Sequence, residues 1–124
     1  GFNKGYFYEP TVFDNVKDNF KIMTEEPFGP LTPILTFKSF EEVIKKANDQ
    51  AAGLAGYVCT SSIELANKTS EALETGMVAV NTPFISNAET PFGGIKQSGY
   101  GREGGSMGIK DYLNIKYTHL GLIG

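Results

Sequence analysis

LAGYVCTSSIELANKTSEALETGMVAVN, residues 54–81, is the stretch that decides the fold class of this chain. Residues 54–60 are predicted to form a strand, and Ser61-Ser62-Ile63-Glu64 carries the capping signature that opens a helix. We expect the helix to end before Gly76, because glycine is favoured just past a helix C-terminus, and residues 77–81 to form the next strand. A strand, a helix and a strand joined by short connections are typical of a right-handed parallel β-α-β unit.

The same pattern extends toward the N-terminus. Residues 31–37 are predicted to form another strand, and Ser39-Phe40-Glu41-Glu42 opens a second helix with the same capping signature. Its apolar side chains fall on one face, at Phe40, Val43, Ile44 and Ala47. The predicted fold class is therefore α/β, with a parallel β-α-β-α-β sheet portion. Ligands of such sheets bind beyond the carboxyl ends of the strands, which places the loop 82–98 at the expected functional edge.

The flanking segments are predicted to be peripheral. Residues 6–13 are rich in aromatic side chains, but Pro10 restricts them to an edge strand or a bulge. We expect a short helical turn within residues 15–26 and another short helix at 107–113. Residues 114–122 alternate loosely and can form a final strand. No partner for this apolar strand remains in the chain, so we expect it to pair with another chain.

Composition narrows the class of protein. The chain has 124 residues, 40% hydrophobic and 20% charged, which suits one soluble domain without a membrane span. A net charge of −3 gives no basic surface for nucleic acid. The single cysteine excludes an internal disulfide and indicates a reducing, cytoplasmic compartment. The first residues contain neither a methionine nor a leader sequence, so we expect a piece of a longer protein.

Seven of the fifteen glycines lie within the sixteen residues 93–108. Such a density predicts close backbone approach or repeated positive φ angles. The segment Gly99–Gly104 matches the dinucleotide pattern G-x-G-x-x-G, but no strand directly precedes it and no acid follows in residues 119–124. We therefore interpret these glycines as a close-packed turn.

A catalytic nucleophile with its base is not visible in the sequence. Cys59 is predicted to lie inside a strand as a buried, inert thiol, with no candidate base nearby. His119 is the only histidine and lies at the far end of the chain. A Cys-His pair and a zinc site are therefore both excluded as interpretations.

The segment Thr24–Pro30 (TEEPFGP) predicts a stiff, exposed corner, because Pro27 and Pro30 prevent a helix from crossing it. Such a corner can present a carboxylate and an aromatic ring to a ligand, and a carboxylate accepts hydrogen bonds from a sugar diol. The alternative is an ordinary connector whose acids are solvated.

Four motifs together resemble the NAD(P)-dependent aldehyde dehydrogenases: Glu25–Pro30, Val80-Asn81, Pro91–Gly99 and Gly101–Glu103 occur in the family's order and spacing. The resemblance implies the C-terminal part of the catalytic domain at residues 1–113 and an oligomerisation strand at 114–124, with a dimer or tetramer as the whole protein. It implies that Glu26 holds the nicotinamide ribose hydroxyls and that Phe28 flanks the nicotinamide ring. The nucleophilic cysteine and its catalytic partners then lie upstream, so the isolated chain is expected to be inactive.

Within this family, residues 81–87 are most similar to the succinate-semialdehyde dehydrogenases, in which a serine at the position of Ser86 helps to bind the distal carboxylate of the substrate. The resemblance implies a reaction that oxidises succinate semialdehyde to the carboxylic acid with NAD or NADP. Asn114 stands where relatives often carry an acid, which would be a plausible partner for Arg102. The alternative interpretation is a stand-alone, non-catalytic binding or assembly module on the same scaffold.

Overall fold

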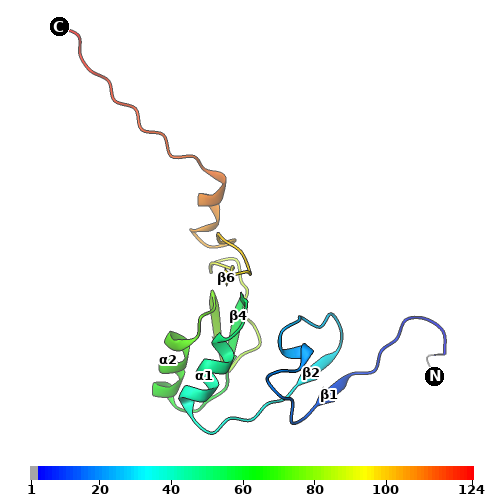
Figure 1. The fold of residues 1–124 in the computed structure, drawn as a ribbon. Helices are drawn as coiled ribbons and strands as arrows, with labels where there is room; N and C mark the ends of the chain where they lie inside the picture. The colour runs from blue at the N-terminus through cyan, green and yellow to red at the C-terminus, as the bar shows by residue number, and fades with distance from the viewer. Residues whose placement is uncertain (1–2) are drawn as a thin grey trace. The chain divides into compact units, whose positions relative to one another are not determined.

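The computed structural model describes residues 3–124, which divide into two compact units (Figure 1). The first unit ends at Ala51, and the second runs from Ala52 to Gly124. Three two-stranded sheets are present among the described residues, one in the first unit and two in the second.

The sheet of the first unit is parallel. Strand β1 (Thr11–Phe13) pairs with β2 (Leu31–Pro33), and the 3-10 helix η1 (Lys21–Met23) lies between them in the sequence. Both strands are shorter than expected: β1 begins only after Pro10, and β2 ends at Pro33, although Ile34 N still donates to Phe13 O at 2.8 Å. The short helical turn predicted within residues 15–26 is confirmed by η1.

Helix α1 (Phe40–Asn48) begins where its capping signature predicts. Ser39 Oγ accepts a hydrogen bond from Glu42 N at 3.1 Å, and the Glu42 carboxylate accepts one from Lys38 N at 2.9 Å. This backbone hydrogen bond, together with one from Lys46, holds the pKa of Glu42 below its usual value. The reciprocal acceptor thus binds one residue earlier than in a standard capping box.

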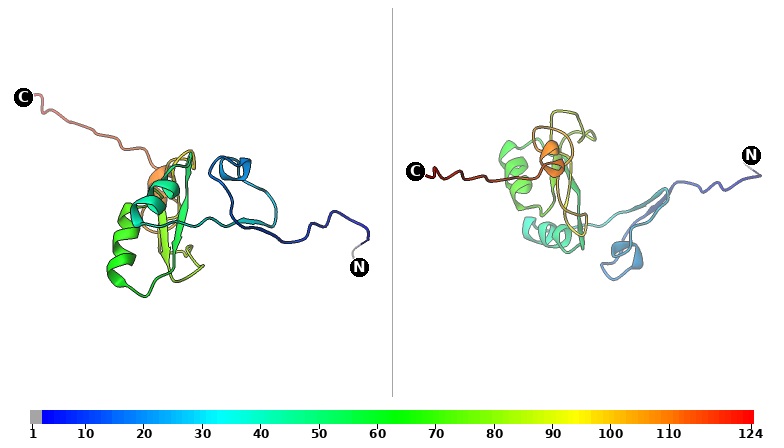
Figure 2. Two further views of the ribbon diagram at one scale, coloured as in Figure 1. Left: turned by 60° about the horizontal axis from the view of Figure 1, so that its bottom comes forward. Right: turned by 90° about the horizontal axis from the view of Figure 1, so that it is seen from above.

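The second unit contains the predicted parallel β-α-β unit, drawn in green in Figures 1 and 2. Strands β4 (Ala55–Val58) and β5 (Met77–Val80) pair in parallel, and helix α2 (Ile63–Ala72) connects them and contacts β4. The cap of α2 is Ser62, whose Oγ accepts from Leu65 N at 3.2 Å. The helix therefore begins one residue later than Ser61 would have placed it.

A second sheet in this unit joins distant parts of the chain. Strand β3 (Ala52–Gly53) pairs antiparallel with β6 (Ile95–Lys96), and the 3-10 helix η2 (Gly108–Tyr112) follows the glycine-rich segment. The α/β class is confirmed: β1 and β2 pair in parallel within the first unit, and β4 and β5 pair in parallel around α2 within the second.

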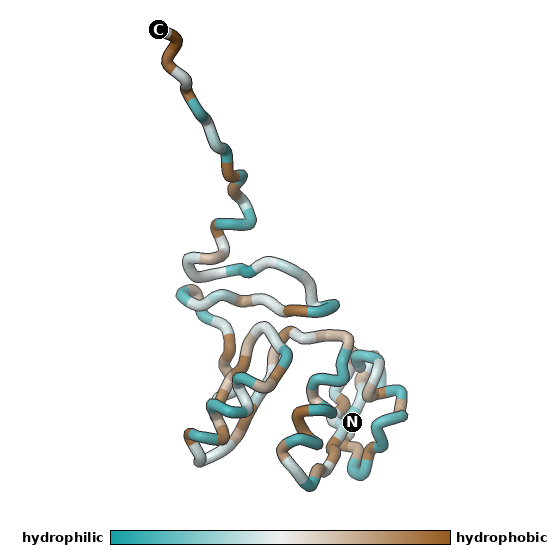
Figure 3. The backbone as a smooth tube through the Cα atoms, turned by 60° about the vertical axis from the view of Figure 1, so that its left-hand side comes forward, coloured by the Kyte–Doolittle hydropathy of each residue, from teal (hydrophilic) through white to brown (hydrophobic). Residues whose placement is uncertain are grey.

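Few side chains are buried. Among the described residues, the buried hydrophobic side chains are Val16 in the first unit and Ala66, Met77 and Ala79 in the second. Residues 114–124 form no strand in the structure, and their large apolar side chains are exposed. Figure 3 marks the hydrophobic residues near the C-terminus in brown. Within residues 3–124, neither the length nor the hydrophobicity of any helix matches that of a membrane span.

Candidate functional site

The two adjacent acids of the proline-rich corner differ in their contacts. Glu25 forms an ion pair with Lys21 at 3.2 Å, and its backbone N–H also donates to Lys21 O. Glu26 is exposed, and within residues 3–124 its carboxylate has no hydrogen bond or ion pair. Phe28 is 95% exposed on the same loop, between η1 and β2. The corner therefore offers one exposed carboxylate without a partner among the described residues and one exposed aromatic ring.

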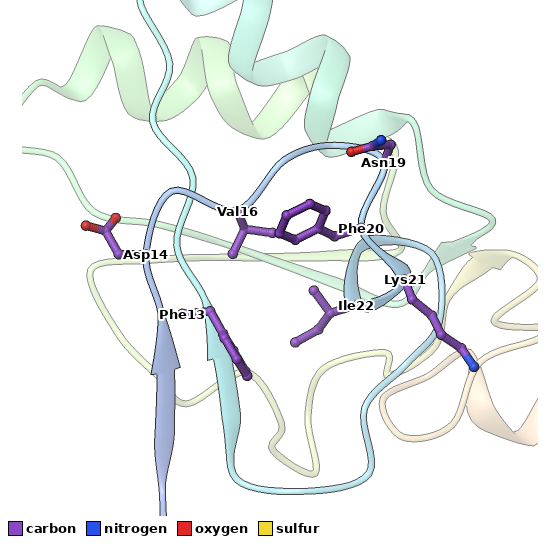
Figure 4. A pocket seen from close by; sticks show the side chains of 7 residues that line it. All are labelled: Phe13, Asp14, Val16, Asn19, Phe20, Lys21 and Ile22. Carbon is purple, nitrogen blue, oxygen red and sulfur yellow. The ribbon is translucent and has the colours of Figure 1, made fainter.

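A pocket of about 510 Å³ lies elsewhere in the first unit (Figure 4). In Figure 4 the side chains of Phe13, Val16, Phe20 and Ile22 gather at its centre, while polar lining residues point outward. Neither Glu26 nor Phe28 lines this pocket. It is a mainly apolar surface between β1 and η1, separate from the predicted nicotinamide contacts.

In the second unit, Asn81 organises the carboxyl end of the parallel strands. Its Oδ1 accepts from Thr60 N at 2.9 Å, and its Nδ2 donates to Thr60 O at 2.8 Å. Its backbone N–H donates to Val58 O at 2.8 Å, and its φ of 56° turns the chain sharply out of β5. The side-chain amide thus continues the ladder beyond the last residue of β5 and fixes where the following loop begins.

Ser86 lies in the loop that follows β5, at the predicted functional edge. It is exposed, and no hydrogen bond to its hydroxyl is found within the described part of the chain. Just beyond it, Asn87 Oδ1 accepts from Glu89 N at 3.1 Å and Thr90 N at 3.0 Å. Ser86 therefore presents a hydroxyl that can bind a ligand, from a loop held at both ends. It belongs to the second unit, whereas Glu26 and Phe28 share a loop of the first.

The prediction that Cys59 is buried inside a strand is wrong. β4 ends at Val58, so Cys59 lies after the strand, and its side chain is exposed. The chain leaves the sheet here because it turns toward α2, with Thr60 Oγ1 accepting from Ser62 N at 3.1 Å. His119 contacts Tyr117 within the C-terminal segment. Among residues 3–124, no group of three or more His, Cys, Asp and Glu side chains could hold a metal ion.

The glycine-rich segment shows both predicted features. Gly99, Gly101, Gly104 and Gly105 all have positive φ angles. A Cβ atom at Gly93 would lie 2.6 Å from Gly101 O, closer than real Cβ atoms approach. The interpretation as a close-packed turn agrees with this geometry, and the segment leads into η2, a 3-10 helix of five residues.

Arg102 is held by backbone groups instead of by residue 114. Its Nη1 donates to Gly94 O at 2.9 Å and to Gly101 O at 2.6 Å. Its backbone N–H donates to Asp111 Oδ2 at 3.1 Å. Asp111, three residues before Asn114, was not predicted from the sequence. It accepts from a backbone N–H, and such a contact requires no charged side chain as partner that a sequence pattern could reveal. The only available signal was an acid in a short predicted helix.

The comparisons with known proteins agree with this fold and these motifs. The model of the aldehyde dehydrogenase family matches residues 1–118. The chain therefore belongs to the aldehyde dehydrogenase family.

Particular relatives narrow the similarity further. The chain is 51% identical over 115 residues to the mitochondrial succinate-semialdehyde dehydrogenase of Arabidopsis thaliana, covering 93% of this chain and 22% of that protein. It is 49% identical over 118 residues to the NADP(+) succinate-semialdehyde dehydrogenase of Escherichia coli, covering 95% of this chain and 24% of that protein. An aldehyde dehydrogenase from Bacillus cereus, solved as an NAD+ complex, is 45% identical to this chain with a TM-score of 0.89. The match covers 94% of this chain and 24% of that one. The chain thus spans about a quarter of the length of these relatives.

Proposed function

We propose that this chain is the C-terminal part of the catalytic domain of an NAD(P)-dependent aldehyde dehydrogenase whose substrate is succinate semialdehyde. The observation that carries the proposal is Ser86, an exposed hydroxyl on an anchored loop at the carboxyl end of β5. A hydroxyl donor suits the distal carboxylate of this substrate, because hydrogen bonds to charged groups are stronger than neutral ones. Two relatives named for this substrate, about 50% identical to the chain, support the assignment.

The cofactor contacts follow from the corner in the first unit. Glu26 would accept hydrogen bonds from the nicotinamide ribose hydroxyls, and Phe28 would flank the nicotinamide ring. The available carboxylate at Glu26 supports this role, since the neighbouring Glu25 is already paired with Lys21. When bound, NAD or NADP accepts the hydride that leaves the substrate. This chain binds and orients the cofactor and the substrate.

The nucleophile of the whole enzyme lies outside this chain in the proposal. Thiolate attack requires an activated cysteine, and Cys59, although exposed, has no base paired with it among the described residues. We therefore expect the isolated chain to oxidise no aldehyde. We also propose a cytoplasmic location for the whole protein, since this chain holds a single cysteine, and we expect a dimer or tetramer joined through residues 114–124.

Steady-state kinetics of the full-length enzyme test the substrate assignment. Ser86→Ala should raise KM for succinate semialdehyde about tenfold or more, the value of a hydrogen bond to a charged group, with KM for butanal little changed. Ser106→Ala is the matched control, because Ser106 is also exposed and its hydroxyl has no hydrogen bond to residues 3–124; it should change neither KM. An equal loss on both aldehydes would contradict the role of Ser86.

The cofactor assignment has a control in the adjacent residue. Glu26→Gln should raise KM for NAD or NADP, whereas Glu25→Gln removes only an exposed ion pair and should leave it unchanged. Titrating each variant with both cofactors gives the comparison. If neither purified variant nor the wild type reduces NAD or NADP with any aldehyde, the non-catalytic binding module becomes the better interpretation.

A further inference from the structure

The loop that carries Ser86 is held from one side by the residues that follow Arg102. Phe92 and Glu103 form an antiparallel pair in which each backbone N–H donates to the other carbonyl at 2.7 Å. Gly105 N donates to Ala88 O at 3.0 Å. The segment Glu103–Gly105 therefore contacts the Ser86 loop through three backbone hydrogen bonds, and we call it the bracing segment.

The bracing segment lies directly against the loop. A Cβ at Gly104 would stand 2.8 Å from Thr90 O, and a Cβ at Gly105 would stand 2.9 Å from Glu89 O. Both glycines also have φ angles in the left-handed region, 67° and 54°. No side chain fits between the two stretches, so a displacement of the bracing segment must displace the loop.

Arg102 and Asp111 fix the start of the bracing segment. The Arg102 side chain is tied to Gly94 O and Gly101 O, and its backbone N–H is tied to the Asp111 carboxylate. A Cβ at Gly101 would collide with that carboxylate, which shows how closely Asp111 approaches the chain here. Glu103 follows Arg102 directly. The contacts of Arg102 with Gly94 O, Gly101 O and the Asp111 carboxylate therefore determine where the N–H and C=O of Glu103 point.

We propose that Arg102 and Asp111 are positioning residues for substrate selection: they hold the bracing segment, which sets the place of the Ser86 hydroxyl. Neither side chain needs to touch the substrate. The proposal rests on the proposed role of Ser86, and it adds that recognition of the carboxylate depends on a contact between η2 and the glycine-rich segment. A purely structural role would predict a loss of stability without a change in the choice between aldehydes.

Variants of Asp111 in the full-length enzyme separate these outcomes. Asp111→Ala removes the acceptor for Arg102 N and should raise KM for succinate semialdehyde about threefold to tenfold, the effect of one net hydrogen bond, while kcat and KM for butanal stay within about twofold. Asp111→Asn keeps an acceptor oxygen and should restore KM close to the wild-type value. Lys110→Ala, at an exposed neighbour in η2, is the matched control and should behave as the wild type.

A double-mutant cycle distinguishes this proposal from the substrate assignment. If Asp111 acts through Ser86, then Asp111→Ala should add no further rise in KM for succinate semialdehyde in the Ser86→Ala background. Selective loss in Ser86→Ala with wild-type selectivity in Asp111→Ala would overturn the positioning role alone. Additive effects of the two changes would also overturn it. No selective loss in Ser86→Ala would overturn the substrate assignment itself.

A milder variant keeps the test decisive if Asp111→Ala does not fold. Arg102→Lys keeps the positive charge but loses the planar guanidinium, whose Nη1 donates to both carbonyl oxygens. It should show the same selective rise in KM, smaller than that of Ser86→Ala. An unchanged ratio of kcat/KM for the two aldehydes in Arg102→Lys would refute the proposal.

Discussion

Replacing Asn81 by alanine tests whether one side chain holds the carboxyl edge of the parallel strands. The substitution removes two hydrogen bonds to the backbone of Thr60, at 2.9 and 2.8 Å. It also places alanine at a φ of 56°, a left-handed conformation that asparagine tolerates better than alanine. Both changes act where β4 and β5 end, so they should weaken the anchor from which the Ser86 loop starts.

The magnitude follows from these two terms. Two hydrogen bonds contribute about 2 kcal/mol together, taking about 1 kcal/mol for each. The left-handed backbone of alanine costs about 1 kcal/mol more. The expected destabilisation is therefore about 3 kcal/mol for Asn81→Ala. For Asn81→Gly we expect about 2 kcal/mol, because glycine loses the same hydrogen bonds but adopts this φ without strain.

Thermal unfolding of the full-length enzyme at a fixed scan rate and protein concentration measures this order. Asn81→Ala should have the lowest Tm, followed by Asn81→Gly and then the wild type. Asn67→Ala is the matched control at an exposed position of α2, and it should be neutral or slightly stabilising because alanine is the better helix former. If Asn81→Ala has the Tm of the wild type, the side-chain amide does not anchor the edge. If Asn81→Ala has the Tm of Asn81→Gly, the left-handed φ costs alanine no stability.

The remaining predictions concern acid stability and assembly. The pKa of Glu42 is lowered in the folded protein, so its carboxylate stabilises the fold fully at pH values above 4.5, its ordinary pKa. This contribution is lost as the pH falls through the lowered pKa of the folded state. Glu42→Gln should therefore remove part of the acid sensitivity of unfolding monitored by circular dichroism, and Glu71→Gln, an exposed acid of α2, should not. Deleting residues 114–124 from the full-length enzyme should lower its mass in light scattering, whereas a monomer with the C-terminal segment intact would contradict the proposed assembly.

The parts of this structure that the sequence predicted well depend on neighbouring residues. A capping serine and its partner three residues later mark the start of α1, and a similar serine marks α2. The parallel pairing of β4 with β5 was predictable from the helix between them, since a strand, a helix and a strand in sequence are the usual way to join parallel strands. These features need no information about distant parts of the chain.

The parts that were missed depend on contacts across the fold. Asp111 binds the backbone of Arg102 across nine residues, and no charge pattern identifies an acceptor for a backbone N–H. The pairing of β2 with β1 joins residues that are twenty apart in the sequence, with η1 between them, so short strands alone did not predict it. For Cys59 the error was a boundary, because one residue decides whether a side chain lies in a strand or beyond it.

The distribution of apolar side chains indicates what stabilises these locally specified elements. Helix α1 has a clear apolar face, yet none of its residues is fully buried, and Phe40, Val43 and Ile44 remain half-buried. A nine-residue helix is marginal in water on its own and depends on packing of its apolar face. Full burial of such side chains contributes about 1.5–3 kcal/mol each. Since the chain spans about a quarter of the length of its relatives, we expect the remaining burial, and the free energy that holds α1 folded, to come from contacts with the rest of a longer protein.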